Sequence, residues 1–149
     1  MKKIGILLSS PKEVGGIYQY SLNVIEALEL LRKKKNFYIK SYYTDQIWKK
    51  ELPRNIEKKF IYKSLFKKIL RKFFNIIISK KKNFFFLKEF LYEEVKIINE
   101  SDCDLVIFPS QNITSYQVEK KSLSTIHDLM HIYESKFSEY TREVITQRN

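Results

Sequence analysis

The sequence predicts an α/β protein of Rossmann-like type, with a parallel sheet and helices on both faces. Short apolar runs of strand length alternate along the chain with longer segments of helical periodicity. The chain has only three glycines and three prolines in 149 residues, too few for an all-β architecture with many tight turns. Because a strand–helix–strand unit brings its two strands parallel, this alternation favours a parallel sheet. The length suits a single domain, residues 1–149, or one half of a larger enzyme.

The first part of the chain predicts strands around one long helix. The strands are short apolar or aromatic runs, whereas the helix repeats its apolar positions every three or four residues. In order, the expected elements are a strand at Lys3–Ser9, a loop at Ser10–Gly16, a helix from Ile17 into the basic run 32–35, and strands at Phe37–Thr44 and Lys59–Tyr62.

The second part predicts two helices and two more strands. Apolar residues recur four apart in each helical segment, and the run before Pro109 is typical of a buried strand. In order, the expected elements are helices at Ser64–Ser79 and Phe84–Asn99, strands at Asp104–Pro109 and Leu123–Ile126, and a polar helical tail at Ser138–Asn149.

The net charge of +11 comes from one segment. Lys58–Lys82 holds ten basic residues and no acidic one, so 18 basic and 17 acidic groups remain in the other 124 residues. A uniformly basic nucleic-acid-binding surface is therefore disfavoured. RNA binding would also need stacking aromatics on the basic face, whereas Phe73 and Phe74 lie toward the apolar side of the expected helix.

The helix expected at Ser64–Ser79 has an apolar stripe at Leu65, Ile69 and Phe73. The basic residues in and next to this helix lie mainly opposite the stripe. They are Lys63, Lys67, Lys68, Arg71 and Lys72. Such a helix can lie on an anionic membrane, with each cation near the surface adding roughly 1 kcal/mol of attraction. Alternatively, the stripe packs on the sheet and the basic face is simply solvated.

Three loops are expected at one edge of the sheet, where ligands of α/β proteins bind. They are Ser9–Gly16, Pro109–Tyr116 and the loop with His127, Asp128 and His131. The Gly15–Gly16 pair opens a helix, so it can present main-chain N–H groups to a phosphate, or it can simply form a tight turn. His127 and Asp128 can bind a ligand or act in proton transfer, or they can cap the loop.

Several common sites are not predicted. The dinucleotide pattern G-x-G-x-x-G and the P-loop are absent, and His127 and His131 lack the Glu of an H-E-x-x-H zinc motif. We therefore expect neither a bound metal nor a cofactor. Cys103 is the single cysteine, which excludes an internal disulfide and favours a small core residue in a reducing compartment.

We expect a cytoplasmic location, either free or peripheral at the inner membrane face. The apolar start of the chain stops at Ser9 and is too short for a signal peptide. The longest apolar runs, Ile76–Ile78 and Phe84–Leu87, fall far short of the ~20 residues that a membrane span needs.

Two stretches of the chain resemble GT-B glycosyltransferases of family 4. The opening KIGILLSSPKEVGGIYQYSLNVIEAL is similar to the family's first strand, Gly-Gly loop and helix that begins G-I-x-x-Y. The later stretch DLVIFPSQN…STIHDLMHIYESKFSEY is similar to its D-x-V-x-x-P strand end and T-x-H-D-L strand end. Residues 45–100 match the family only in element type.

The resemblance implies a retaining transfer of a sugar from a nucleotide-sugar donor to a glycan or lipid-linked acceptor, with no required metal. The chain would be the N-terminal, acceptor-side domain. Gly15 and Gly16 would face the donor diphosphate, and His127 and Asp128 would line the pocket of the reacting sugar. Tyr20, like Tyr18, is a further candidate, although helix packing explains both equally well. In many relatives, a basic amphipathic helix meets a membrane acceptor, and Lys58–Lys82 looks similar.

The sequence departs from the family in one respect. Family members carry a second Rossmann-like domain with a Glu-x7-Glu motif, and no two glutamates here are eight apart. We therefore expect negligible transferase activity from the chain alone. Either the gene is split or truncated, or a separate chain supplies the nucleotide-sugar domain. The alternative function is a non-catalytic Rossmann-like module, an enzyme remnant that docks on anionic membrane.

Overall fold

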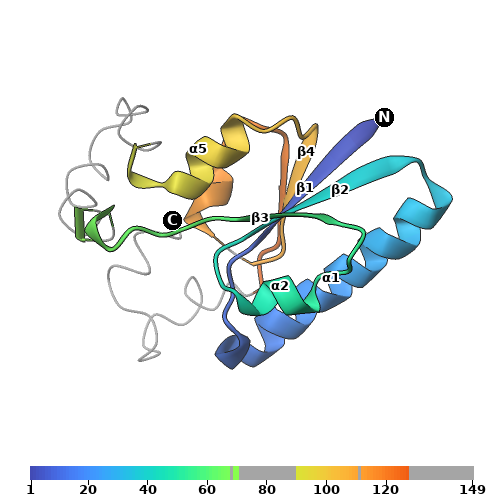
Figure 1. Ribbon diagram of the computed structural model, residues 1–149, viewed down its shortest axis with the longest axis horizontal. Coiled ribbons are helices and arrows are strands. Elements are labelled where there is room, and N and C mark those ends of the chain that lie inside the picture. The colour runs from blue at the N-terminus through green and yellow to red at the C-terminus, as the bar shows by residue number, and fades with distance from the viewer. Residues whose placement is uncertain (68, 71–89, 111, 128–149) are drawn as a thin grey trace.

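The computed structural model describes residues 1–67, 69–70, 90–110 and 112–127 as a parallel sheet between helices (Figure 1). The strands are β1 (Lys2–Leu8), β2 (Phe37–Tyr43), β3 (Glu57–Phe60), β4 (Leu105–Phe108) and β5 (Ser122–Ser124). The helices are α1 (Gly15–Lys34), α2 (Ile47–Glu51) and α5 (Glu93–Asn99), and two short 3₁₀ turns are η1 (Lys12–Val14) and η2 (Ile113–Tyr116). The expected tail at Ser138–Asn149 lies outside the described residues.

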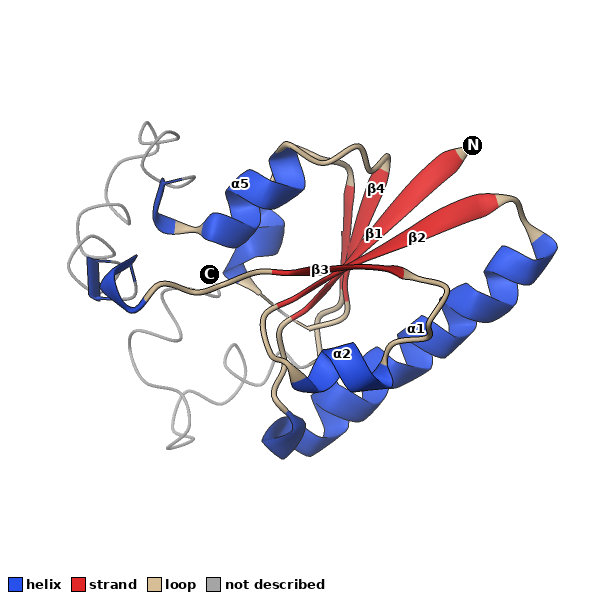
Figure 2. Cartoon of the chain, in the orientation of Figure 1, coloured by secondary structure: helices blue, strands red, loops and turns tan. Residues whose placement is uncertain are grey.

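The five strands are all parallel and lie in the order β3-β2-β1-β4-β5 (Figure 2). The register brings Ile4 of β1 opposite Ile39 of β2 on one side and Leu105 of β4 on the other. From β1 the chain first builds outward through β2 and β3, and then crosses to the opposite side for β4 and β5. The switch point of the sheet therefore lies between β1 and β4, which is where ligands bind in open α/β sheets.

The helices cover both faces of the sheet, as the sequence predicts. Figure 1 shows α1 and α2 on one face and α5 on the other. Alternate residues of β1 enter the two cores, because successive side chains of a strand point to opposite faces. Ile6 and Leu8 pack with Ile25 of α1, whereas Leu7 packs with Ile98 of α5. This two-sided burial explains why β1 is a continuous apolar run rather than an alternating pattern.

The start of α1 differs from the prediction. The helix was expected after the Gly-Gly pair, but Gly15 and Gly16 are its first two residues. Gly15 has φ 37° and ψ −92°, a backbone conformation that glycine adopts far more easily than other residues. The pair therefore bends the chain from η1 directly into α1.

Three further predictions need correction. The short helix α2 and its buried Trp48 are not predicted, and the third strand begins two residues earlier than expected, at Glu57. The helix expected at Phe84–Asn99 is interrupted at Tyr92. This residue is the N-cap of α5 and has an extended backbone, with φ −112° and ψ 94°. Within the described ranges, no helix is both long and apolar enough to cross a membrane.

Candidate functional site

The loops after β1 and β4 meet at the switch point of the sheet. The hydroxyl of Ser9, just after β1, lies 3.2 Å from that of Ser110, just after β4. Asn112 donates from Nδ2 to the same Ser9 hydroxyl over 3.1 Å. These contacts join residues more than 100 positions apart in sequence. Two of the three expected loops therefore converge, as predicted, at the carboxyl ends of neighbouring strands.

Asn112 is held by the start of η2. Its side-chain Oδ1 accepts a hydrogen bond from the Thr114 amide at 3.0 Å, and its carbonyl accepts one from the Ser115 hydroxyl at 2.7 Å. This is the N-cap arrangement, in which a short polar side chain satisfies an amide of the first helical turn. Since Oδ1 is occupied by the cap, the amide group Nδ2 is the part that reaches Ser9.

The third loop joins the other two through His127. Its Nε2 lies 2.7 Å from the carbonyl oxygen of Pro109, at the end of β4. The imidazole also meets the ring of Tyr20 from α1 edge-on, with the centroids 5.1 Å apart and the planes at 89°. Thr125 donates from Oγ1 to the Tyr20 hydroxyl at 3.4 Å. The ends of β1, β4 and β5 and the first turns of α1 therefore share one region.

The beginning of α1 is open on its outer side. A Cβ placed on either Gly15 or Gly16 would meet no atom within 4 Å. Val14 at the N-cap provides no side-chain hydrogen bond, and the first turn carries no acidic residue. The Gly15 amide donates to the Lys12 carbonyl, however, so an anion here would depend on the amides that follow it.

The two tyrosines near this helix start have different surroundings. Tyr18 is 6% exposed and packs against Trp48, with the ring centroids 4.6 Å apart. Burial, followed by the nearby Glu51 carboxylate, raises the pKa of the Tyr18 hydroxyl. Tyr20 is 39% exposed and faces His127. Tyr18 is thus a core residue, and Tyr20 is the tyrosine that lies beside the candidate site.

Other predicted site residues are only partly described. Asp128, Lys68, Arg71 and Lys72 lie outside the described residues. Lys63 is exposed, whereas Lys67 forms an ion pair with Glu93 and lies 5.4 Å from the centre of the Phe90 ring.

Three residues of the site, Ser9, Ser110 and Asn112, are not singled out by the sequence. Their loops were predicted to carry ligands, but a serine after a strand is too common to suggest a role by itself. Only the pairing of β1 with β4 brings these side chains together. The described part of the chain contains no group of three or more His, Cys, Asp or Glu side chains that could hold a metal ion.

Comparisons with protein-family models, curated proteins and solved structures found no match for this chain. The geometry of the site and the motifs of the sequence therefore carry the functional proposal.

Proposed function

We propose that this chain is the acceptor-side domain of a retaining glycosyltransferase, which transfers a sugar from a nucleotide-sugar to a glycan or lipid-linked acceptor. The observation that carries the proposal is the meeting of His127, Tyr20 and Pro109 beside the switch point. All three residues belong to the sequence motifs that resemble the family, and the folded chain brings these motifs to one edge of the sheet.

The residues at this edge suit a ligand with a phosphate and several hydroxyl groups. The open first turn of α1 offers main-chain amides and the positive end of the helix dipole to an anion. The hydroxyls of Ser9 and Ser110, the amide of Asn112 and the imidazole of His127 offer side-chain hydrogen-bonding groups. A sugar attached to a diphosphate combines the two kinds of ligand group.

A transfer assay with a separate nucleotide-sugar domain tests the proposal. The chain is co-expressed with the product of the adjacent downstream reading frame, and sugar transfer from labelled nucleotide-sugars to a membrane lipid extract is measured. We expect transfer by the pair and negligible transfer by the chain alone. His127→Ala should lower the rate of the pair by about 100-fold or more, the usual loss for a polar group that acts at a reacting centre.

Tyr38→Leu is the matched control, because Tyr38 is 57% exposed on β2 and lies opposite Lys3 at the amino end of the sheet. It should leave the rate unchanged. Transfer by the chain alone would contradict the need for a second domain. An active pair in which His127→Ala has no effect would remove the proposed site.

The second candidate function, docking on an anionic membrane, is favoured by exposed apolar side chains in and beside the basic segment. Leu65, Phe66 and Ile69 are 73%, 67% and 58% exposed. The packed residue of this turn is instead Leu70, which contacts the cluster of Leu91, Tyr92 and Val95. Leu65 and Ile69 therefore do not pack on the sheet, as the alternative interpretation of the apolar stripe would require. Exposed apolar groups beside lysines are typical of membrane-surface helices.

Liposome flotation separates this candidate from a purely structural surface. We expect the chain to float with vesicles that contain phosphatidylglycerol and to stay below with pure phosphatidylcholine vesicles. Leu65→Ser with Phe66→Ser should reduce flotation severalfold. The matched control is Leu30→Ser with Leu31→Ser, which changes two leucines that are 54% and 50% exposed and that precede the basic run 32–35. Equal loss from both pairs of substitutions would show that this surface has no specific role.

A further inference from the structure

The hydrogen bond between His127 and Pro109 determines which ring nitrogen carries the proton. A main-chain carbonyl only accepts hydrogen bonds, so Nε2 must donate across the 2.7 Å to the Pro109 oxygen. In the neutral ring, Nδ1 then has a free lone pair and acts as an acceptor. We propose that Pro109 and Tyr20 are positioning residues that hold His127 as the Nε2–H tautomer, so that Nδ1 is the atom offered to a ligand hydroxyl.

Tyr20 restricts the orientation of the same ring. Its aromatic plane is nearly perpendicular to the imidazole, at 89° and a centroid distance of 5.1 Å, which is a favourable edge-to-face arrangement. The Tyr20 hydroxyl is itself held by Thr125, two residues before His127. Rotation of the imidazole by half a turn would exchange its nitrogens for carbons and break the bond to Pro109. The two contacts together therefore select one ring orientation.

The available Nδ1 favours one kind of ligand group. A lone pair accepts a hydrogen bond from a hydroxyl but repels the lone pairs of an unprotonated phosphate oxygen. The hydroxyl groups of a sugar therefore fit beside neutral His127, and phosphate fits better at the start of α1. This assignment of ligand rests on the function proposed above, whereas the tautomer of His127 does not depend on it.

Nitrogen NMR measures the tautomer directly. The full chain is labelled with ¹⁵N-histidine, and long-range proton–nitrogen spectra report which nitrogen is protonated once titration has established that the ring is neutral. The chain has two histidines, so His131→Gln assigns the signals of His127. The same chain unfolded in urea supplies the reference ratio of Nε2–H to Nδ1–H. We expect the folded ratio to be about tenfold higher, as one net hydrogen bond provides. An unchanged ratio, or a dominant Nδ1–H form, would overturn the proposal.

Substitutions of Tyr20 test its role separately from folding. Tyr20→Phe keeps the ring and should keep the folded ratio, whereas Tyr20→Leu should move the ratio severalfold toward that of the unfolded chain. Tyr38→Leu is the control, since it removes another exposed ring far from His127. Circular dichroism establishes that each variant is folded. If Tyr20→Leu behaves like Tyr38→Leu, Tyr20 does not position the imidazole.

Two small ligands test the hydroxyl assignment. Glucose 1-phosphate and inorganic phosphate, at equal millimolar concentrations, share a phosphate, but only the former carries sugar hydroxyls. We expect glucose 1-phosphate alone to shift the Nδ1 resonance of His127. An equal shift from inorganic phosphate would overturn the hydroxyl assignment. No shift from either ligand, with the Nε2–H tautomer intact, would count against the hydroxyl assignment and the proposed function but leave the positioning by Pro109 in place.

Discussion

Trp48 donates a hydrogen bond from its indole Nε1 to the main-chain carbonyl of Ser10 over 3.0 Å. The indole is fully buried and also packs against Tyr18 of α1. One side chain of the unpredicted helix α2 thus anchors both the loop after β1 and the first turns of α1. These are the segments that place Ser9 and the Gly-Gly pair at the candidate site.

Trp48→Phe is expected to destabilise the chain by about 2 kcal/mol, because it leaves the Ser10 carbonyl without its donor and removes buried ring atoms. Urea unfolding followed by circular dichroism measures the change, since Trp48 is the single tryptophan and its fluorescence is lost in the variant. A change below about 0.5 kcal/mol, within the range of ordinary surface substitutions, would show that the anchor is unimportant.

The two glycines at the start of α1 are expected to respond oppositely to alanine. Gly15→Ala must place a Cβ at a positive φ, so it should lower the free energy of unfolding by about 1–3 kcal/mol. Gly16 lies in the helix with open space around it, so Gly16→Ala should raise that free energy by about 0.5–1 kcal/mol. Urea unfolding of the two variants provides the comparison. The same sign for both would contradict the conformation of Gly15.

Gly5 of β1 lies against the core on the α5 face, where a Cβ would come within 3.1 Å of the Cys103 sulfur and 3.3 Å of Val106. Gly5→Ala should therefore cost about 1–3 kcal/mol of stability through overpacking. Cys103→Ala removes the nearest atom, so the double variant should be more stable than the sum of the single changes predicts. Strict additivity in a double-mutant cycle would show that the sulfur does not limit the space at Gly5.

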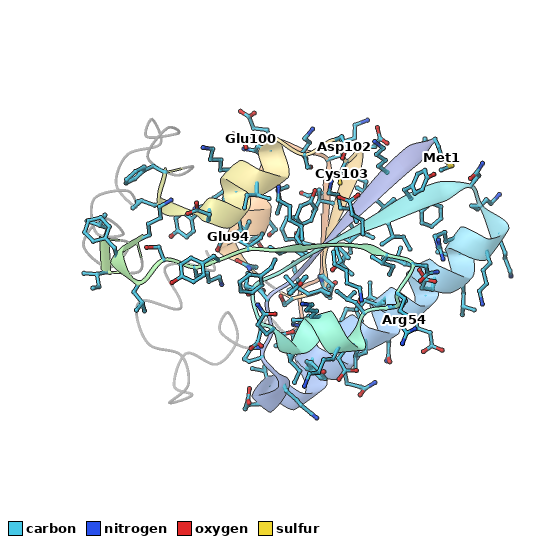
Figure 3. All side chains as sticks on the ribbon, viewed as in Figure 1. Met1, Arg54, Glu94, Glu100, Asp102 and Cys103 are labelled. Atoms are coloured by element: carbon cyan, nitrogen blue, oxygen red, sulfur yellow. The ribbon has the colours of Figure 1, made fainter. Side chains whose placement is uncertain are left out.

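Asp102 precedes β4 and forms an exposed ion pair with Lys3 of β1, close to the N-terminus in Figure 3. Its hydrogen bond with Lys3, more than the charge itself, holds the pKa of Asp102 below its ordinary value. The stabilisation is therefore present above the ordinary carboxyl pKa of about 4 and is lost as the pH falls through the lowered folded value. The hydrogen bond with Asp102 also raises the pKa of Lys3. The stabilisation by the ion pair is therefore lost again at alkaline pH, where Lys3 loses its proton.

Asp102→Asn should accordingly reduce stability slightly at neutral pH and flatten the loss of stability below about pH 4. Thermal unfolding across the acid range, at low and high salt, measures both effects. Glu100→Gln is the control, because it also removes one negative charge near the same turn. It should keep the dependence of stability on pH that the unsubstituted chain shows. Parallel curves for Asp102→Asn and the unsubstituted chain would show that the ion pair does not contribute.

The sequence predicts the regular elements well where burial is continuous. β1, β2 and β4 lie within one or two residues of their expected bounds, because strands buried on both faces need long apolar runs. Prediction fails where the local pattern is weak. The five residues of α2 are too few for a helical period, and nothing in the residues around Tyr92 marks the break before α5.

The sequence also identifies the loops of the candidate site but not all of its side chains. His127, Tyr20 and the Gly-Gly pair are recognisable because they stand in motifs. Ser9, Ser110 and Asn112 acquire a common position only when β1 and β4 pair. Their hydrogen bonds span more than 100 residues, and local spacing contains no information about such contacts.

The sequence by itself determined the alternating α/β pattern, the parallel sheet and the edge at which the three loops end. Apolar periodicity is a local property, and each strand–helix–strand connection brings its two strands parallel. Only the tertiary structure decided that the switch point lies between β1 and β4, that Trp48 anchors the first loop and that Nε2 of His127 faces Pro109. The physical reason is that strand order and side-chain orientation arise from packing between distant segments, which compete for the same core and the same hydrogen-bond partners.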